Sequence, residues 1–342
     1  MWPIVSSDMV SVIMPAYNSA AWIEAAIRSV MVQTFTDWQL IVADDGSTDS
    51  TPDIVKTLVE EDSRISVIPL SHQGVANVRN TAIEEARGEY LAFIDSDDIW
   101  PRWNLQLLMK NLSESAADIS CGKLVEFDDA DSKKVMERID KEDLRQEDHT
   151  PENISGVEAV EKSLYQRGVS SSLSGKVFRR ELFDGCRMNS GEIYEDLDLF
   201  YRVALGARNV AVSNVPVYFY RQRRGSIIHT FSFRRLDVLK VTQRMVEFVK
   251  EKYPSLLNAA LDRRFAANFN MLVEITRHLD SPDLPPHEKA QYEKSREKIT
   301  SLLRREAGRE LRNGKVRLKN RLGALLLILI PSDAILYKIA RL

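Results

Sequence analysis

The sequence predicts an α/β fold with a mainly parallel central sheet, followed by a helical C-terminal region. Within residues 1–100, short apolar runs of strand length alternate with helical segments, which is typical of βαβ units. From Ser232 onward the apolar spacing is helical, with Leu236, Leu239 and Val246 on one face. We therefore expect the sheet within residues 1–230 and the helical region within residues 231–342.

Each strand and helix of the first part has its own signal. Short apolar runs predict strands at Val10–Met14, Trp38–Ala43, Ile65–Pro69 and Leu91–Ile94. Helices are expected after Asn18, which is a good N-cap, and after Asp49 or Ser50, with Pro52 in the first turn. A third helix is expected over Val75–Ala86.

The following segment is less regular. Trp100–Leu112 predicts a helix, and Ile119–Phe127 predicts a strand. Asp128–Pro151 has little apolar content, so we expect a long mobile excursion there.

Composition limits the class of protein. A length of 342 residues allows one large domain or two, and a formal net charge of -3 excludes a globally basic nucleic-acid binder. Cys121 and Cys186 are the two cysteines, and they have no CxxC spacing, which fits a reducing compartment. The N-terminus lacks the pattern of a signal peptide, and no apolar run approaches the ~20 residues of a spanning helix. We expect a cytoplasmic protein.

Three carboxylates follow the fourth strand, at Asp95, Asp97 and Asp98. Like charges crowded in this way repel unless a cation neutralises them. Mg²⁺ or Mn²⁺ suits the position, because carboxylate oxygens are hard ligands and these ions keep other coordination positions for water and phosphates. The alternative is that Asp98 caps a helix entered at Pro101, with Asp95 and Asp97 in a solvated turn.

Polar motifs also follow the first two strands. Pro15 to Asn18 comes after the first strand, and Asp44 with Asp45 comes after the second. Because the carboxyl ends of parallel strands meet at one edge of a sheet, where ligands bind, these motifs converge with Asp95 to Asp98. The convergence favours a site for a metal and a nucleotide.

Five motifs together resemble glycosyltransferase family 2, which has the GT-A fold. In chain order they are Pro15-Ala16-Tyr17-Asn18, Gln33-Thr34-Phe35, Asp44-Asp45-Gly46-Ser47-Thr48-Asp49, Gly74 with Ala76, Arg79 and Asn80, and Asp95-Ser96-Asp97-Asp98. Each motif is weak alone, but their order and spacing are very specific. The resemblance implies a GT-A catalytic domain over residues 1–230, with a nucleotide-binding half over about 1–100 and an acceptor half over about 101–230.

The resemblance also implies the site residues of a metal-dependent enzyme. Asp95 and Asp97 would hold Mn²⁺ or Mg²⁺ on the diphosphate of the donor. The implied nucleotide-sugar-binding residues are Pro15, Ala16, Tyr17, Asn18, Asp44, Asp45, Arg79, Asp95, Ser96, Arg221 and Arg223.

Simple physical chemistry agrees with several of these roles. Tyr17 offers a ring that can stack on a base, and Asp45 can accept a hydrogen bond from an imide or a ribose hydroxyl. Arg79 could face the diphosphate. The alternatives are a packed core edge for Tyr17 and a solvated helix position for Arg79. His72 has no partner visible in the sequence and is interpreted as a loop residue.

A second carboxylate pair, Glu195 and Asp196, begins a helix that Leu197, Phe200 and Val203 predict. Carboxylates at this position complement the helix dipole, so capping is one interpretation. The family resemblance implies another, in which one of the pair takes the proton of the acceptor hydroxyl as a general base. Asp196 is the first choice and Glu195 the second.

Two further segments resemble the family. Ser174 to Phe183 matches without implying a role for Lys176 beyond packing or a surface contact. In the basic segment that follows the strand beginning at Val217, Arg221 and Arg223 could close over the departing nucleoside diphosphate. The alternative for that segment is a surface basic loop.

The C-terminal tail, residues 304–342, combines charge and apolarity. Arg304 to Arg321 carries eight basic residues against Glu306 and Glu310, and the apolar run Leu322–Ile330 follows. This run is too short to span a bilayer, but it suits a peripheral contact with an anionic membrane. The alternative is a helix docked on the catalytic domain.

The sequence therefore predicts an inverting glycosyltransferase that moves a sugar, most simply from a UDP-sugar, to a carbohydrate or lipid-linked glycan in bacterial surface polysaccharide synthesis. Its expected place is the inner face of the plasma membrane, with no nucleic-acid partner. A nucleotidyltransferase that forms nucleotide-sugars is a rival, but it should carry a Gly-rich loop where Pro15 to Asn18 stands. A non-catalytic nucleotide-sugar-binding protein is the other rival, and Asp97 and Asp196 count against it.

Overall fold

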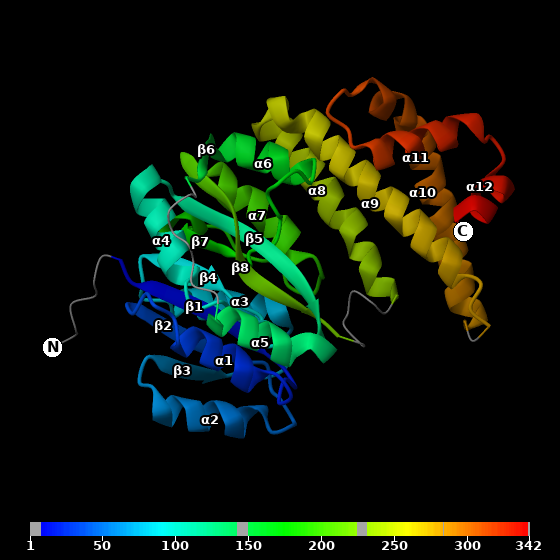
Figure 1. Ribbon diagram of the computed structural model, residues 1–342. Coiled ribbons are helices and arrows are strands. Elements are labelled where there is room, and N and C mark those ends of the chain that lie inside the picture. The colour runs from blue at the N-terminus through cyan, green and yellow to red at the C-terminus, as the bar shows by residue number, and fades with distance from the viewer. Residues whose placement is uncertain (1–7, 142–149, 224–230, 283, 341–342) are drawn as a thin grey trace. The chain divides into compact units, whose positions relative to one another are not determined.

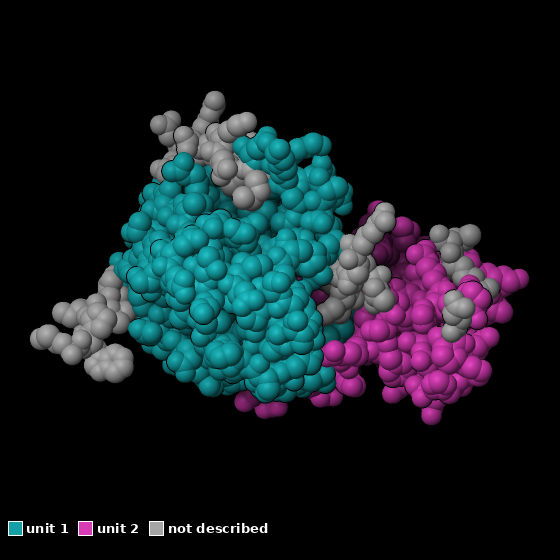
Figure 2. Space-filling view, turned by 90° about the horizontal axis from the view of Figure 1, so that it is seen from below, with its two compact units in different colours: residues 1–160, 169–226 teal, residues 161–168, 227–342 magenta. Residues whose placement is uncertain are grey.

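The computed structural model describes residues 8–141, 150–223, 231–282 and 284–340. Contacts divide the chain into two compact units, which Figure 2 shows in different colours. Unit 1 comprises residues 1–160 and 169–226, and unit 2 comprises residues 161–168 and 227–342. Unit 1 contains the sheet, and unit 2 contains the long C-terminal helices.

Unit 1 is built on a sheet of eight strands in the order β3-β2-β1-β4-β7-β5-β8-β6 (Figure 1). The strands are β1 (Val10–Ala16), β2 (Trp38–Asp44), β3 (Ile65–Pro69), β4 (Tyr90–Phe93), β5 (Ile119–Asp128), β6 (Glu152–Ser155), β7 (Lys176–Arg179) and β8 (Asn209–Gln222). β1 to β4 pair in parallel, whereas β7 runs antiparallel between β4 and β5. β8 pairs in parallel with β5 and antiparallel with β6. The carboxyl ends of β1, β2 and β4 thus share one edge, as the sequence predicted.

Helices connect these strands and form unit 2. The helices between the strands are α1 (Ile23–Met31), α2 (Thr51–Glu61), α3 (Val75–Glu84), α4 (Asn104–Ser115), α5 (Ser132–Lys141), α6 (Gly156–Leu164) and α7 (Glu195–Leu205). Unit 2 contains α8 (Asp237–Lys252), α9 (Leu257–His278), α10 (Pro286–Arg312), α11 (Leu318–Leu329) and α12 (Asp333–Ala340). Short 3₁₀ turns lie at Asp129–Asp131, Arg180–Phe183, Phe233–Leu236 and Pro254–Leu256.

Both faces of the central strands are buried. Val12 and Met14 of β1 belong to a cluster with Ile27 of α1 and with residues of α4. On the opposite face, Phe93 of β4 packs edge-on against Phe178 of β7 at 6.1 Å between ring centroids. Because side chains alternate between the two faces of a strand, this burial fixes the register of β1 and β4 and hence the place where each strand ends.

One helix begins later than the sequence predicted. The predicted start at Trp100 is wrong, because α4 begins at Asn104. The buried side chain of Gln33 explains the difference: its amide donates to the carbonyl of Pro101 at 2.8 Å, and its oxygen accepts from the backbone N–H of Leu105 at 3.0 Å. Gln33 therefore satisfies the first turn of α4 from another segment of the chain.

The capping role predicted for Asn18 is also wrong. Asn18 adopts a left-handed conformation with φ of 47°, and α1 begins only at Ile23. Its side-chain oxygen accepts a hydrogen bond from the backbone N–H of Thr48 at 2.8 Å. Asn18 therefore ties the loop after β1 to the loop after β2.

The segment expected to be a long excursion contains a helix. α5 occupies Ser132–Lys141, preceded by a 3₁₀ turn at Asp129–Asp131. The sequence signal was weak because α5 has little apolar content. The rest of the predicted excursion falls in part on residues 142–149, which lie outside the described residues.

The helices of unit 2 bury a small polar group within an apolar core. Leu272 of α9 and Leu303 of α10 are buried, and Asn320 of α11, also buried, donates to Asp262 of α9 at 2.8 Å. The carboxyl group of Glu310, 1% exposed, accepts from Arg309 at 2.9 Å. Burial, and then the charge of Asp262, raise the pKa of Glu310 to about 7.

This raised pKa predicts how the stability of unit 2 depends on pH. A carboxyl group whose pKa is higher in the folded chain binds more protons there, so its stabilising effect is full below pH ~4.5 and is lost as the pH rises through about 7. Glu310→Gln imitates the protonated form. We expect this variant to gain on the order of 2 kcal/mol over the natural chain between pH 5 and pH 8.

Thermal unfolding followed by far-UV circular dichroism across this pH range measures the difference. The matched control is Glu297→Gln, an exposed glutamate of the same helix. Melting temperatures of the natural chain and Glu310→Gln that run parallel from pH 5 to pH 8 would contradict the prediction.

Candidate functional site

The loops after β1 and β2 are joined to each other. The backbone N–H of Asn18 donates to the hydroxyl of Ser47 at 2.9 Å, and that hydroxyl donates to Asp44 at 2.5 Å. Gly46 turns the second loop with φ of 76°, and a Cβ there would meet the backbone of His72 at 3.2 Å. A side chain at this position would therefore disturb the approach of the two loops to the segment before α3.

Asp45 organises that segment. Its carboxylate accepts from the backbone N–H of Gln73 at 2.8 Å and of Gly74 at 2.9 Å, and its side chain is 6% exposed. The ring of His72, whose Nδ1 lies 3.2 Å from Asp45, is 4.4 Å from the ring of Tyr17. Tyr17 is 45% exposed, so the packed-edge alternative for it is wrong, and its ring is accessible.

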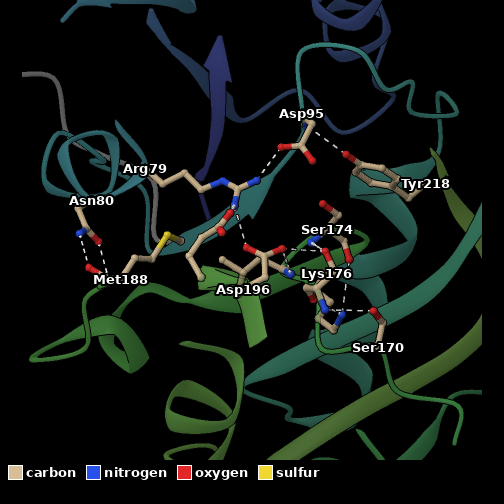
Figure 3. A network of polar contacts seen from close by, with 12 residues as sticks. Arg79, Asn80, Asp95, Ser170, Ser174, Lys176, Met188, Asp196 and Tyr218 are labelled. Carbon is tan, nitrogen blue, oxygen red and sulfur yellow. Dashed lines mark hydrogen bonds and ion pairs between the residues drawn. The ribbon is translucent and has the colours of Figure 1, made fainter. Parts of the chain in front are cut away.

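Arg79 of α3 is the centre of the polar edge (Figure 3). Its guanidinium donates to Asp95 at 2.6 Å, to Glu195 at 2.8 Å and to Asp196 at 2.8 Å. Arg79 is 4% exposed, so it is not the solvated helix residue that was one sequence interpretation. One buried cation thus connects the end of β4 with the first turn of α7.

The electrostatics of this cluster follow from burial and charge. Burial alone would lower the pKa of Arg79, but the charges of Asp196, Asp95 and Glu195 outweigh it and raise that pKa. Burial raises the pKa of Asp95 and of Glu195, and Arg79 opposes both shifts. Three carboxylates against one guanidinium leave a formal excess of two negative charges, which favours binding of a further cation.

The first turn of α7 is held in place from both sides. Tyr194, which precedes it, adopts a left-handed conformation with φ of 71°, which is uncommon for a bulky residue. Upstream, Asn80 exchanges two hydrogen bonds with the backbone of Met188, each of 3.0 Å. Neighbouring side chains of α3, Arg79 and Asn80, therefore bind α7 and the segment leading to it, as Figure 3 shows.

Asp98 lies inside the protein, so the helix-cap interpretation of this residue is wrong. It is 0% exposed, and it accepts from the hydroxyl of Tyr218 at 2.6 Å and from the backbone N–H of Arg221 at 2.8 Å. Burial, and then the neighbouring charges of Asp95 and Asp97, raise the pKa of Asp98 well above its ordinary value. Tyr218 in turn accepts from the backbone N–H of Asp95 at 3.0 Å, so Asp98 supports the backbone at Asp95 through Tyr218.

Arg221, near the end of β8, and Arg223, just after it, have different surroundings. Arg221 is 5% exposed, donates to the carbonyl of Asp97 at 2.6 Å and to Asp129 at 2.8 Å. Arg223 is one-third exposed and donates to the carboxylate of Asp97 at 2.7 Å, with its guanidinium 4.4 Å from the ring centroid of Trp22. Arg221 therefore anchors the loop, whereas Arg223 is the more accessible cation.

The remaining predicted residues lie at the same edge. Pro15 and Ala16 form the last pairs of β1 with β2, and the hydroxyl of Ser96 lies 2.7 Å from that of Ser19. Two residues that contact Asp196 were not predicted, Ser172 and Leu173. The signal that could have found them is the run of serines immediately before the family-like segment at Ser174.

The residues present fit a divalent cation bound with a substrate. Asp95 and Asp97 offer carboxylate oxygens and are partly exposed. The ion pair with Arg79 uses Oδ1 of Asp95, and the ion pair with Arg223 uses Oδ2 of Asp97. Across the described residues, no group of three or more His, Cys, Asp or Glu side chains could by itself hold a metal ion. One or two carboxylates suffice for Mg²⁺ or Mn²⁺ where phosphate and water supply the other ligands.

The sheet order, the helices that cover it and this carboxylate-rich edge define a GT-A protein. The sequence model of Glycosyl transferase family 2 matches residues 11–184, about half of the chain. The chain belongs to this family, and the resemblance inferred from the motifs is confirmed. The match ends before Glu195 and Asp196.

Relatives and solved structures agree with this assignment. Glycosyltransferase GlyG of Streptococcus pneumoniae is 27% identical over 261 residues, which cover 75% of this chain and 83% of that protein. The UDP-Glc:alpha-D-GlcNAc-diphosphoundecaprenol beta-1,3-glucosyltransferase WfgD of Escherichia coli is 47% identical over 93 residues, 27% of this chain and 36% of WfgD. The crystal structure of S. aureus TarS 1-349 in complex with UDP-GlcNAc shares the fold, with a TM-score of 0.67, 20% identity and coverage of 93% and 88%.

The cluster predicts that unit 1 depends on Arg79 for its stability. Arg79→Met leaves three carboxylates buried without their cation, which should cost about 3–5 kcal/mol. All five tryptophans lie within residues 1–103, so urea unfolding followed by tryptophan fluorescence reports on unit 1.

The matched control for this prediction is Arg64→Met. Its guanidinium lies 3.7 Å from the ring centroid of Trp38, and its side chain is 35% exposed. We expect a loss below about 1 kcal/mol for this partly exposed arginine, which leaves no buried carboxylate cluster behind. Equal losses for the two variants would contradict the structural role of Arg79.

Proposed function

We propose that this chain transfers a sugar from a UDP-sugar to the hydroxyl group of a carbohydrate or lipid-linked glycan, with inversion at the anomeric carbon. The observation that carries the proposal is the Arg79 cluster, because it joins Asp95 of the donor-side motif to the Glu195-Asp196 pair. A direct displacement needs a base beside the donor. The cluster holds a donor-side carboxylate, Asp95, and a candidate base, Asp196, on the one guanidinium of Arg79. The UDP moiety is supported by the ligand of TarS and by the name of WfgD.

The donor's nucleotide is assigned to the ends of β1 and β2. Tyr17 would stack on the base, and the joined loops that contain Pro15, Ala16, Asn18, Asp44 and Asp45 would surround base and ribose. Ser96 would lie near the ribose with Asp95. The exposure of Tyr17 and the hydrogen bonds that fix these loops support this assignment.

The diphosphate is assigned to Asp95, Asp97 and Arg223. The two carboxylates would hold Mn²⁺ or Mg²⁺, which when bound supplies positive charge to the departing diphosphate. Arg223 already pairs with Asp97 and is exposed enough to meet a phosphate, whereas Arg221 is buried against Asp129. Arg79 would act by holding Asp95, instead of binding the diphosphate itself.

Asp196 is the proposed base. Its side chain is 22% exposed against 13% for Glu195, so it is the more accessible to an acceptor. In the proposed step the acceptor oxygen forms a bond to the anomeric carbon, its proton passes to Asp196, and the bond from the anomeric carbon to the phosphate oxygen breaks. The electron pair of that bond leaves with the nucleoside diphosphate, so no covalent enzyme intermediate is formed.

A lipid-linked acceptor is the finer part of the proposal. WfgD, by its name, acts on a glycan linked to diphosphoundecaprenol. In this chain α11 packs on α9 and α10 with one face, while Leu318, Leu322, Leu325 and Leu329 are exposed on another. α11 is thus packed on one side against helices of its own unit and is apolar and exposed on the other, and docking of the tail on the catalytic domain stays the alternative prediction.

The charges around α11 suit an anionic lipid surface. From Arg312 to Ser332 the sequence has five basic residues and no carboxylate. Lys319 is exposed beside the leucines. Within the described part of the chain no helix has the length and apolarity to cross a bilayer. The exposed leucines and the basic residues together support our proposal of a peripheral contact at the inner face of the plasma membrane, which would bring the enzyme to its acceptor.

Asp196→Asn tests the base. We expect a transfer rate lower by ~10² to 10⁴, because the acceptor proton loses its receiver, with calorimetric binding of UDP-GlcNAc close to that of the natural chain. Glu195→Gln should have the smaller effect on rate. A collapse of donor affinity in Asp196→Asn would assign this residue to the donor site instead.

Asp97→Asn tests the metal assignment. Removal of a carboxylate ligand should weaken the dependence of UDP binding on Mn²⁺ while the fold is kept, since Asp97 is at the edge of the site. Calorimetric titration with UDP, with and without Mn²⁺, measures this dependence in both chains. An Mn²⁺ effect of equal size in the variant and in the natural chain would remove Asp97 from the metal site.

A double variant, Leu322→Gln with Leu325→Gln, tests the membrane contact. Flotation with vesicles of anionic lipid should fall about tenfold, and high salt should weaken the binding of the natural chain. Val32→Gln is the control, because Val32 is 57% exposed outside unit 2. Equal flotation of all three proteins at low salt would exclude α11 as the lipid-binding face.

A further inference from the structure

Asp196 is held by both of its carboxylate oxygens. Oδ1 accepts from the guanidinium of Arg79 at 2.8 Å. Oδ2 accepts from the hydroxyl of Ser172 at 2.9 Å and from the backbone N–H of Leu173 at 3.2 Å. A carboxylate oxygen has two lone pairs, so two hydrogen bonds occupy Oδ2 while Oδ1 keeps one free direction. These contacts make Oδ1 the atom that can receive a proton.

The loop that binds Oδ2 is itself held by Lys176. The ammonium of Lys176 donates to the carbonyl of Ser172 at 2.6 Å and reaches that of Ser174 at 3.5 Å. The backbone N–H of Ser174 donates to the hydroxyl of Ser172 at 3.1 Å, which orients this hydroxyl toward Asp196. Figure 3 shows Lys176 and Ser174 beside the carboxylate. Ser172, whose hydroxyl contacts Asp196, is therefore fixed both at its carbonyl and at its side chain.

A lysine in this position is costly for the fold. Lys176 is 2% exposed, its Nζ lies 5.1 Å from the ring centroid of Phe200, and burial lowers its pKa. An apolar side chain would fill the same space without the cost of burying an ammonium group. Gly175, with φ of 70°, turns the chain so that the preceding carbonyls face back to Lys176. The buried position of Lys176 is thus explained by its hydrogen bonds to the Ser172 loop and not by the packing of β7 alone.

We propose that Ser172 and Lys176 are positioning residues for the reaction, Ser172 by fixing Oδ2 of Asp196 and Lys176 by fixing the loop that contains Ser172. This inference rests on the proposed function, in which Asp196 is the base. With Oδ2 held, the carboxylate has one orientation, and Oδ1 faces the acceptor hydroxyl. Loss of the Ser172 hydroxyl lets the carboxylate rotate, which lowers the rate of proton transfer without changing the donor site.

The test compares three serine variants with UDP-GlcNAc as the donor probe. Ser172→Ala should lower kcat for transfer about tenfold, with KM for the donor and the melting temperature unchanged. Ser172→Thr keeps the hydroxyl and should restore kcat to within about threefold. Ser171→Ala is the control from the same loop, since the contacts of Asp196 among the described residues come from Arg79, Ser172 and Leu173.

Lys176→Met gives a second measurement, because methionine keeps the unbranched stem but removes the ammonium. We expect kcat to fall about 10²-fold, with calorimetric binding of UDP-GlcNAc unchanged. If Lys176→Met does not fold, the serine variants alone decide the inference. A kcat of Ser172→Ala equal to that of the natural chain overturns it, and so does a loss that Ser172→Thr does not restore.

The same experiment separates this inference from the proposed function. An inactive Asp196→Asn beside a fully active Ser172→Ala overturns only the positioning role. An Asp196→Asn variant with the natural rate overturns the proposed base, whatever the serine variants do.

Discussion

A guanidinium buried among three carboxylates is the interaction on which the site depends. Removal of an ion from water costs several kcal/mol even after relaxation, and the attraction between buried charges offsets this only where the geometry is good. Arg79 meets that condition with contacts of 2.6 to 2.8 Å to Asp95, Glu195 and Asp196. The partners come from the end of β4 and the start of α7, which are about 100 residues apart in the sequence. The cluster therefore sets the distance between Asp95, the proposed metal ligand, and Asp196, the proposed base.

The other contacts of the site extend this constraint outward. Asp98 and Tyr218 fix the backbone of Asp95 through hydrogen bonds. Asn80 holds the segment before α7, and the Ser172 loop holds Oδ2 of Asp196. Tyr218 is on β8 and Asn80 is on α3, and the burial of these elements fixes their register, whereas Asp98 and Ser172 lie in loops and are held by these hydrogen bonds. The accessible groups, Tyr17 and Arg223, lie on the loops at its margin.

The sequence predicted β1 to β5 well, because each contains an apolar run with a clear boundary, and β3 was predicted at its observed bounds, whereas β6 and β7 were not predicted and β8 begins at Asn209, before the expected Val217. It also brought Asn18, Asp45 and Asp95 to one edge, since parallel strands end together, whereas Asp196 was assigned to the site by the family resemblance. It failed where a contact between distant segments decides the local structure, as the side chain of Gln33 does at the start of α4 and the backbone N–H of Thr48 does at Asn18. The run of serines before Ser174 draws attention to Ser172, but its contact with Asp196 and the burial of Arg79 were not predictable, because they join segments whose approach no local pattern encodes.

The most direct test of this account is a double-mutant cycle between Arg79→Met and Asp196→Asn, measured as the free energy of unfolding of unit 1 by tryptophan fluorescence. Beside the natural arginine, Asp196→Asn removes one partner of a buried ion pair and should destabilise the unit. In the Arg79→Met chain the same change removes one of three uncompensated carboxylates, so it should stabilise the unit. A change of sign between the two backgrounds is the predicted result, and an equal effect in both would contradict the claim that Arg79 holds the site together.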